Sequence, residues 1–411
     1  MIYIKIELKS CLLNIIILLL LYIQFFSYTG VSYTLVSGSS HAFQQIPRSL
    51  SLFFLLKILV IIALIILGFT ILKRKSLNKL LMISIFALVA SSIFWSINTL
   101  LNIGLKRYVY ETSIPYIYLI TLSFIIGVDE KLFLKIKRNS KYIVIFSFAY
   151  SIISLFFFIQ NHPQGILGNS TSLMFFIQGF WFLYLYAYKN QNRIFTNLLI
   201  AVAITIAILL NTRSFLIQSL ILFVFYNYYL IDKKKRMKFL KTLILVVIIS
   251  TISFWVVSQI APQLLEYFMA KGINDTRSFQ YKDFFRNIDF STLLFGKGYE
   301  FQYYSSKMGG MYSYIDNGCL FLLFRYGISI LLPYITLLIV PIRLSRKKIS
   351  FEDRFLIIII IVWFSAISGL SVYNLITLDL QNMVPLIVAG RLYMISKNNY
   401  FHKNLDNAIR D

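Results

Sequence analysis

Charged residues are scarce in this sequence. Asp, Glu, Lys and Arg make up 14% of its 411 residues, whereas hydrophobic residues make up 58%. This balance excludes an ordinary soluble domain, in which about a quarter of the residues are charged. Cysteine is rare as well: Cys11 and Cys319 lie far apart in apolar surroundings, which argues against a disulfide framework. The three histidines have no Cys, Asp or Glu at ligand spacing, so we predict no metal site and no cofactor.

Acidic residues are few, 16 against 40 Lys and Arg, and the formal net charge is +24. In a soluble protein this excess would indicate nucleic acid as a partner. Here the basic residues fall in short clusters between apolar runs, which is the pattern of cytoplasmic loops in membrane proteins. We therefore expect membrane lipid, and no nucleic acid, around the chain.

Long apolar runs are abundant, and each is near the ~20 residues that cross a bilayer as a helix. They predict an all-α polytopic integral membrane protein with about twelve transmembrane helices. Because no A-x-A-like cleavage site follows the first run, we expect it to be a retained span rather than a signal peptide. The runs cover 11–28, 50–72, 77–101, 113–128, 142–160, 172–188, 194–210, 214–231, 242–260, 315–341, 355–370 and 374–395.

The basic clusters also predict orientation. With the N-terminus in the cytoplasm, the clusters around 73–79, 131–141, 233–241 and 343–354 all fall on the cytoplasmic side. Both termini are then cytoplasmic, and 261–314 is one large extracytoplasmic loop. The predicted organisation is nine helices in 1–260, the loop in 261–314 with short surface helices, and three helices with a cytoplasmic tail in 315–411.

The loop is predicted to begin with an amphipathic helix capped by Asp275-Thr276. A helix that follows this cap would lie on the bilayer surface. Its apolar face would hold Tyr281, Phe284, Phe285 and Ile288, and its polar face Ser278, Lys282, Asp283, Arg286 and Asp289.

Three charged residues around the loop are candidates for chemistry. Arg213 opens a span on the predicted outer side, either as an arginine that snorkels to headgroups or as a clamp for phosphate oxygens. Arg277 lies in the first turn of the loop helix, as a solvated charge or a second phosphate contact. Asp316 precedes the next span, where it caps the helix, acts as a general base for a sugar hydroxyl, or does both.

Other polar and aromatic residues have simpler interpretations. Tyr303, Tyr304 and neighbouring tyrosines form an interfacial aromatic belt or offer stacking faces to sugar rings. Arg325, Asp379 and Arg391 lie in or near spans, where an unpaired charge costs at least ~2.5 kcal/mol. We expect Asp379 to pair with Arg325 or Arg391 and these three residues to be structural.

Together, these motifs resemble the O-antigen polymerase and ligase superfamily, especially the Wzy-like polymerases. The pattern covers roughly 205–330 and consists of Thr212-Arg213-Ser214, Arg277, Leu294-Phe295-Gly296-Lys297-Gly298, and Asp316-Asn317 followed by Gly327. Ligases of this superfamily carry His-Asn where this chain has Asp316-Asn317, and the small residue expected three positions after Gly327 is Ile330. The missing histidine favours a polymerase.

The resemblance implies a membrane glycosyltransferase of the C-type fold class, without a nucleotide-sugar donor or a required metal. Its substrates would be undecaprenyl-diphosphate-linked oligosaccharides, joined into O-antigen or capsular polysaccharide on the outer face of the bacterial cytoplasmic (inner) membrane. Arg213, Arg277 and Asp316 would be catalytic, and Asn317, Gly298, Tyr303 and Tyr304 would bind substrate. A chain-length regulator and a flippase are further expected partners.

Three other functions stay open. A ligase would use the same donor but transfer the glycan to lipid A-core. A transporter would flip the lipid-linked oligosaccharide, although such folds often show related halves around a midplane site. A non-enzymatic scaffold would tolerate loss of all three charged candidates.

Overall fold

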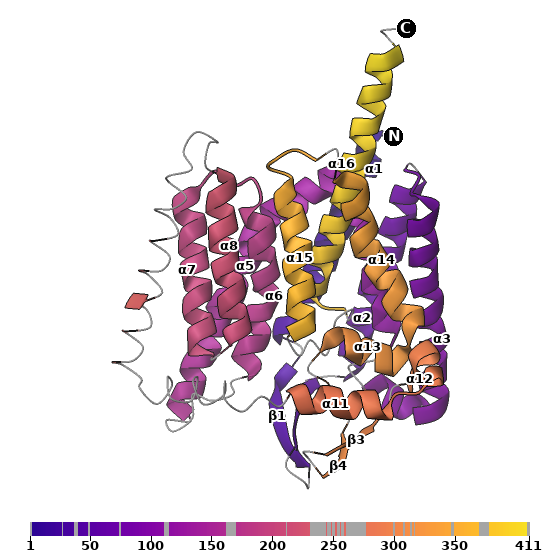
Figure 1. Ribbon diagram of the computed structural model, residues 1–411, viewed down its shortest axis with the longest axis vertical. Coiled ribbons are helices and arrows are strands. Elements are labelled where there is room, and N and C mark those ends of the chain that lie inside the picture. The colour runs from indigo at the N-terminus through magenta and orange to yellow at the C-terminus, as the bar shows by residue number, and fades with distance from the viewer. Residues whose placement is uncertain are drawn as a thin grey trace. The chain divides into compact units, whose positions relative to one another are not determined.

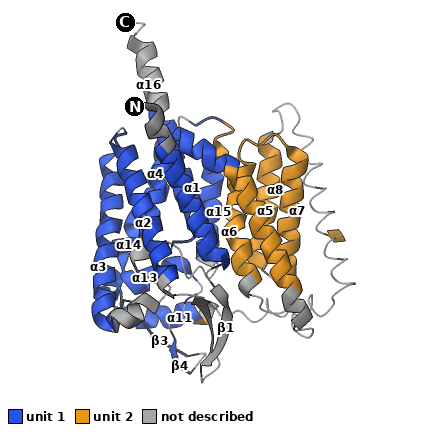
Figure 2. Ribbon diagram, turned by 180° about the vertical axis from the view of Figure 1, so that it is seen from behind, with its two compact units in different colours: residues 1–138, 280–350, 356–411 blue, residues 139–279, 351–355 orange. Residues whose placement is uncertain are grey.

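The protein forms two compact units in a computed structural model (Figure 2). Unit 1 contains residues 1–138, 280–350 and 356–411, and unit 2 contains 139–279 and 351–355. Unit 2 therefore consists of two segments that interrupt the sequence of unit 1. The structure describes residues 2–26, 28–36, 40–47, 50–73, 75–110, 115–161, 170–210, 212–230, 277–298, 301–306, 309–312, 315, 317–346, 349–369 and 378–408, with single positions between 244 and 259.

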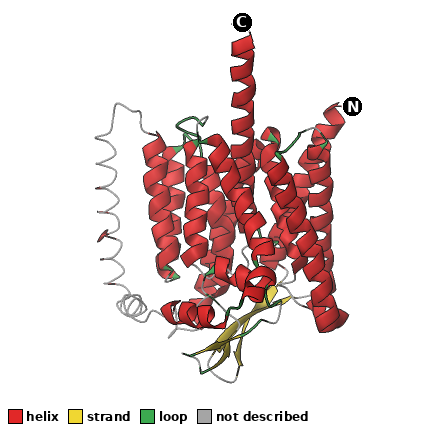
Figure 3. Ribbon diagram, turned by 45° about the vertical axis from the view of Figure 1, so that its right-hand side comes forward, coloured by secondary structure: helices red, strands yellow, loops and turns green. Residues whose placement is uncertain are grey.

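Helices dominate the described residues (Figure 1; Figure 3). The helices are α1 (Ile2–Phe26), α2 (Leu50–Leu72), α3 (Lys79–Tyr110), the 3-10 helix η1 (Pro115–Leu122), α4 (Ser123–Val128), α5 (Glu130–Asn161), α6 (Ser170–Ala187), α7 (Arg193–Leu209), α8 (Arg213–Leu230), α11 (Arg277–Asn287), α12 (Phe290–Phe295), α13 (Gly318–Tyr326), α14 (Ile328–Ser345), α15 (Arg354–Gly369) and α16 (Leu380–Ala408). The strands are β1 (Tyr28–Val36), β2 (Ser40–Pro47), β3 (Tyr303–Ser305) and β4 (Gly310–Tyr312).

Five described helices are long and apolar enough to cross a membrane: Leu8–Phe26, Leu52–Leu72, Lys79–Asn102, Glu130–Phe156 and Ile328–Ser345. Shorter apolar helices cover 119–128, 172–187, 193–209 and 354–367. Many apolar side chains on these helices are exposed, including Phe86 at 75% and Leu101 at 78%. The described residues thus belong to a mostly helical membrane protein. The number of twelve spans stays a prediction.

Several predicted spans match the helices closely, but two are interrupted. The run 113–128 contains η1 followed by α4, and the run 315–341 is divided into α13 and α14 at Gly327. Gly327 has φ +71°, a conformation that ends a right-handed helix and that glycine adopts readily. Most of the predicted span 242–260 and all of the loop before residue 277, including the predicted cap Asp275-Thr276, lie outside the described residues.

Two antiparallel hairpins accompany the helices. β1 pairs with β2 and β3 pairs with β4, the latter with Tyr303 opposite Tyr312. The sequence interpretation contained neither hairpin. Apart from Tyr28, β1 and β2 lie between the predicted spans 11–28 and 50–72, and β3 and β4 lie in the predicted loop 261–314.

The interior of unit 1 is built around a close crossing of α4 and α16. A Cβ atom on Gly127 would lie 1.9 Å from the carbonyl oxygen of Ile387, and one on Gly390 would lie 2.0 Å from that of Phe124. Only glycine permits this approach, because any side chain would overlap the opposite backbone. Small residues at such crossings let membrane helices pack backbone to backbone.

Unit 2 has an aromatic core contributed mainly by α6. Phe176, Phe180, Trp181 and Tyr184 are almost completely buried, and the Phe180 ring meets Phe215 of α8 edge-on at 4.9 Å between centroids. Such pairs add about 0.5–1.5 kcal/mol beyond the area they bury. This core positions the start of α8, where the candidate Arg213 lies.

Candidate functional site

The glycine motif that carries the resemblance forms a tight backbone junction in unit 1. The amide of Lys297 donates to the carbonyl of Phe324, and the amide of Gly298 donates to the carbonyl of Arg325, both at 2.8 Å. These bonds fasten the turn after α12 onto the last turn of α13. They also satisfy carbonyl groups that a helix end would otherwise leave unpaired.

Both glycines of this junction are required by its geometry. Gly296 has φ +74°, and a Cβ on it would lie 2.4 Å from the carbonyl oxygen of Arg325. Gly327 faces it from the other segment, where a Cβ would lie 2.3 Å from the carbonyl oxygen of Leu294. Two parts of the sequence pattern, about thirty residues apart, therefore meet through their glycines. We call residues 294–298 with 324–327 the glycine junction.

Gly298, one of the predicted substrate-binding residues, is buried in this junction. It has φ +84°, and a Cβ on it would lie 3.3 Å from the Trp95 ring of α3. Trp95 in turn packs edge-on against Tyr326, with 5.3 Å between ring centroids. The structure thus gives Gly298 a packing contact and does not expose it toward a ligand.

The two predicted sugar-stacking tyrosines differ in exposure. Tyr303 is 1% exposed and belongs to a small core in which its ring lies 5.9 Å from Phe324 and 6.0 Å from Tyr312. Tyr304, the next residue of strand β3, is 54% exposed. Side chains alternate between the faces of a strand, so only Tyr304 of this pair offers its ring outward.

The prediction for the faces of α11 is partly wrong. Phe284 is buried as expected, but Phe285 is 63% exposed and Asp283 is 3% exposed. Asp283 turns inward because its carboxylate accepts hydrogen bonds from the amide and the hydroxyl of Ser306, at 2.7 and 2.8 Å. A charged acceptor satisfied by charge-assisted hydrogen bonds tolerates burial, so the tie to the end of β3 decides which face of α11 points inward.

The polar residues at the start of α13 are partly described. Asn317 is the N-cap of α13, and its side-chain oxygen accepts from the amide of Leu320 at 3.1 Å. Asp316 lies outside the described residues. Arg277 is the first residue of α11, as expected for the first turn of the loop helix, and its side chain lies outside the described part.

Arg213 is the first residue of α8 and is half-buried. The preceding turn is held by Thr212, whose amide and hydroxyl both donate to the carbonyl of Ala207, at 2.9 and 3.1 Å. Arg213 belongs to unit 2, whereas the glycine junction belongs to unit 1.

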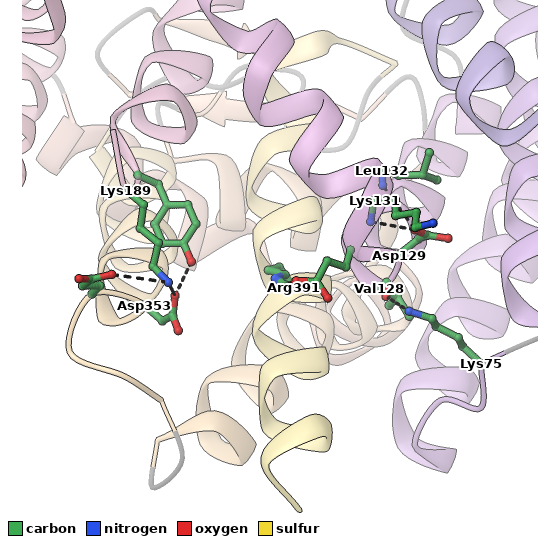
Figure 4. Close-up of polar contacts among 11 residues, drawn as sticks. Lys75, Val128, Asp129, Lys131, Leu132, Lys189, Asp353 and Arg391 are labelled. Carbon is green, nitrogen blue, oxygen red and sulfur yellow. Dashed lines mark hydrogen bonds and ion pairs between the residues drawn. The ribbon is translucent and has the colours of Figure 1, made fainter. Parts of the chain in front are cut away.

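Charged residues within the helices of unit 1 pair differently from the prediction. Arg391 bonds Glu130 at 2.6 Å (Figure 4), not Asp379. Asp379 instead accepts a hydrogen bond from the Gln24 side chain and is the electrostatic partner of Lys57. Arg325, 7% exposed, has its guanidinium 5.3 Å from the centroid of the Tyr326 ring.

The Gln24, Lys57 and Asp379 group is a polar cluster that the sequence interpretation missed. Lys57 is 4% exposed inside α2, with its ammonium 4.1 Å from the centroid of the Phe53 ring. The available signal was a single lysine eight positions into the apolar run 50–72. Charged residues inside a membrane are rare and face a partner inside the protein. Lys57 alone was therefore enough to predict a polar or charged partner on another helix.

A second polar group joins the start of α5 to α1 and to the loop between α2 and α3. Lys9 bonds Asp129 at 3.0 Å. Lys75 donates to the carbonyl of Val128 at 2.9 Å (Figure 4). Burial opposes ionisation of Asp129, but the hydrogen bond and charge of Lys9 outweigh it and hold the pKa of that carboxyl below its usual value. These residues belong to predicted cytoplasmic segments, which the fold of unit 1 gathers at one end.

Within the described residues, no group of three or more His, Cys, Asp or Glu is arranged to hold a metal ion. A scan against protein-family models finds no match, and searches of curated proteins and of solved structures find none. The fold and the candidate site together define a mostly helical membrane protein. In it, the glycine junction joins the short helices α12 and α13 beside the apolar helices α3 and α14.

Proposed function

We propose that the protein is a polymerase that joins undecaprenyl-diphosphate-linked oligosaccharide repeat units into O-antigen or capsular polysaccharide. The reaction forms a bond between a terminal hydroxyl oxygen of the incoming unit and the anomeric carbon of the growing glycan. The bond from that carbon to the carrier diphosphate breaks, and the hydroxyl proton passes to a base. The proposal puts this reaction on the outer face of the bacterial cytoplasmic membrane.

The glycine junction is the observation that supports this function best. The resemblance depends on a spaced pattern, and a chance pattern gives no reason for Gly296 and Gly327 to meet. In this protein both glycines are needed for the same backbone contact, and two hydrogen bonds join the segments that carry them. The glycines of the pattern therefore take part in one backbone contact. The apolar helices around it suit a lipid-linked substrate.

The catalytic roles follow the chemistry of the side chains. Arg213 and Arg277 would bind the donor diphosphate and stabilise the charge that develops as it leaves. Asp316 would orient or deprotonate the acceptor hydroxyl. Tyr304 is the exposed ring for a sugar, whereas Gly298, Tyr303 and the capping Asn317 would act by positioning the loop.

The test is polymerisation of purified cognate lipid-linked repeat units by the reconstituted protein. Arg277→Ala and Asp316→Asn should each lower the rate about 10²–10⁴-fold, the usual range for loss of an acid–base or charge-stabilising group. Arg286→Ala on the exposed face of α11 and Asp289→Asn at the start of α12 are matched controls, and both should keep the wild-type ladder of lengths.

The other outcomes point to a different function or to a different site. Transfer to isolated lipid A-core without chain extension would assign the ligase activity. Flipping of the lipid-linked unit in proteoliposomes without polymerisation would assign the transporter. A ladder that survives both Arg277→Ala and Asp316→Asn would keep the polymerase but reject this site.

A further inference from the structure

Helix α12 carries two large exposed aromatic side chains. Phe290 is 74% exposed and Phe295 is 67% exposed, at the first and last positions of the helix. The side of α12 that is covered holds Thr292, and Asp289 caps the helix with a 2.6 Å bond to the Thr292 amide. At about 25 cal/mol per Å² of apolar surface, two phenylalanine rings facing water would be a considerable cost for so short a helix.

Helix α12 lies beside two apolar helices, α3 and α14. Gly298, just after α12, lies against Trp95 of α3. Trp95 is seven residues inside the end of the apolar segment Lys79–Asn102, which corresponds to about 10 Å along a helix. On its other side, Leu294 of α12 contacts Gly327, which immediately precedes the apolar helix Ile328–Ser345.

The exposed faces of those two helices are mostly apolar next to α12, with Asn102 and Ser329 as exposed polar residues. In a helix that crosses a membrane, exposed apolar side chains of this kind face lipid. On α3 they are Phe94 (60%), Ile97 (53%) and Leu101 (78%), and on α14 they are Ile328 (40%) and Leu332 (57%). Phe290 and Phe295 are the large exposed apolar side chains of α12, which the glycine junction holds beside these two helices.

We propose that α12 and the turn after it are seated in the bilayer interface, with the Phe290 and Phe295 rings among the lipid acyl chains. The partner is the membrane itself. Lys297, exposed directly after the helix, donates to the carbonyl of Asn287 at 3.3 Å and places its ammonium where headgroup phosphates lie. This inference goes beyond the proposed polymerase and holds for any activity, because it depends only on α3, α14 and the glycine junction.

Site-directed spin labelling of the full chain in liposomes tests the proposal. In a Cys11→Ala, Cys319→Ala background, single cysteines replace Phe290, Phe295, Leu101 or Tyr304 and receive a nitroxide. Leu101 is the lipid-facing reference. Tyr304, 54% exposed, is the aqueous reference, because Figure 1 shows β3 and β4 on the side of α11 away from α14.

The measured quantity is the ratio of the label's collision with oxygen, which concentrates in acyl chains, to its collision with a water-soluble nickel chelate. We expect a ratio above one at positions 290, 295 and 101 and below one at 304. Ratios below one at 290 and 295 would overturn the proposal, and so would a ratio below one at 101, because α3 would then not border lipid. All four labelled positions are exposed, so the variants should retain the fold.

Discussion

Lys57, which is buried, and its half-buried electrostatic partner Asp379 allow a quantitative prediction about unit 1. Lys57→Met would leave Asp379 without its cation, and Asp379→Asn would leave the ammonium of Lys57 inside α2 without its anion. Removing one partner of a buried pair costs about 3–5 kcal/mol, and insertion scales assign about 2.5–3.5 kcal/mol to one uncompensated charge at the centre of a span. Each single substitution should therefore lower the free energy of unfolding by about 3 kcal/mol.

The double substitution should cost no more than either single one, because it leaves no unpaired charge. The amide oxygen that Asp379→Asn introduces would still accept from Gln24, which donates to Asp379 in the wild-type protein. The measurement is the folded fraction during graded SDS titration in mixed micelles, for wild type, both single variants and the double variant. An additive double variant, or single variants that each cost under about 1 kcal/mol, would refute the reasoning. If the single variants fail to fold, recovery of the folded protein in the double variant gives the same answer.

Two further predictions concern the glycine crossing and the cap of α12. Gly127→Ala should destabilise the protein by about 3 kcal/mol or more, because the added Cβ would lie 1.9 Å from the Ile387 carbonyl oxygen. This cost is at or above the upper end of the usual range for overpacking. The control is Gly310→Ala, where a Cβ meets nothing within 4 Å and stability should change by under about 0.5 kcal/mol in the same titration. The hydrogen bonds from Thr292 hold the pKa of Asp289 at about 2. The ionised Asp289 cap therefore stabilises α12 fully above the ordinary carboxyl pKa, and this stabilisation is lost as pH falls toward 2. Hydrogen exchange at the α12 amides, corrected for the intrinsic pH dependence, should report this loss of protection, and unchanged protection in that window would contradict it.

The sequence predicted helices best where composition alone decides the structure. The run 50–72 is apolar throughout and coincides with α2. The interruption at Gly327 was missed because the run 315–341 stays apolar across it, and only the approach of Leu294 explains the turn. The inward position of Asp283 depends on Ser306, twenty-three residues away, which helical periodicity does not contain.

In the candidate site as well, the sequence predicted the local features and missed those that depend on distant residues. Position in the sequence was enough to predict that Arg277 lies in the first turn of a helix. The start of the next helix was predicted as well, but its cap was assigned to Asp316, whereas Asn317 is the N-cap of α13. Burial was not predictable from residue type, since Tyr303 and Tyr304 are neighbours with opposite exposure. The partner of Asp379 was predicted wrongly because long-range pairing depends on how α1, α2 and α16 pack, and the sequence gives the charges without their neighbours.

The contact between Gly127 and Gly390 also bears on how the chain is made. Ribosomes deliver α4 long before α16, and about 260 residues separate the two glycines. During that interval the glycine surface of α4 has no α16 to cover it, so unit 1 closes only after unit 2 has been synthesised and passed into the membrane. Stalling synthesis before residue 390 should therefore leave a chain that has entered the bilayer but is still sensitive to quality-control proteases.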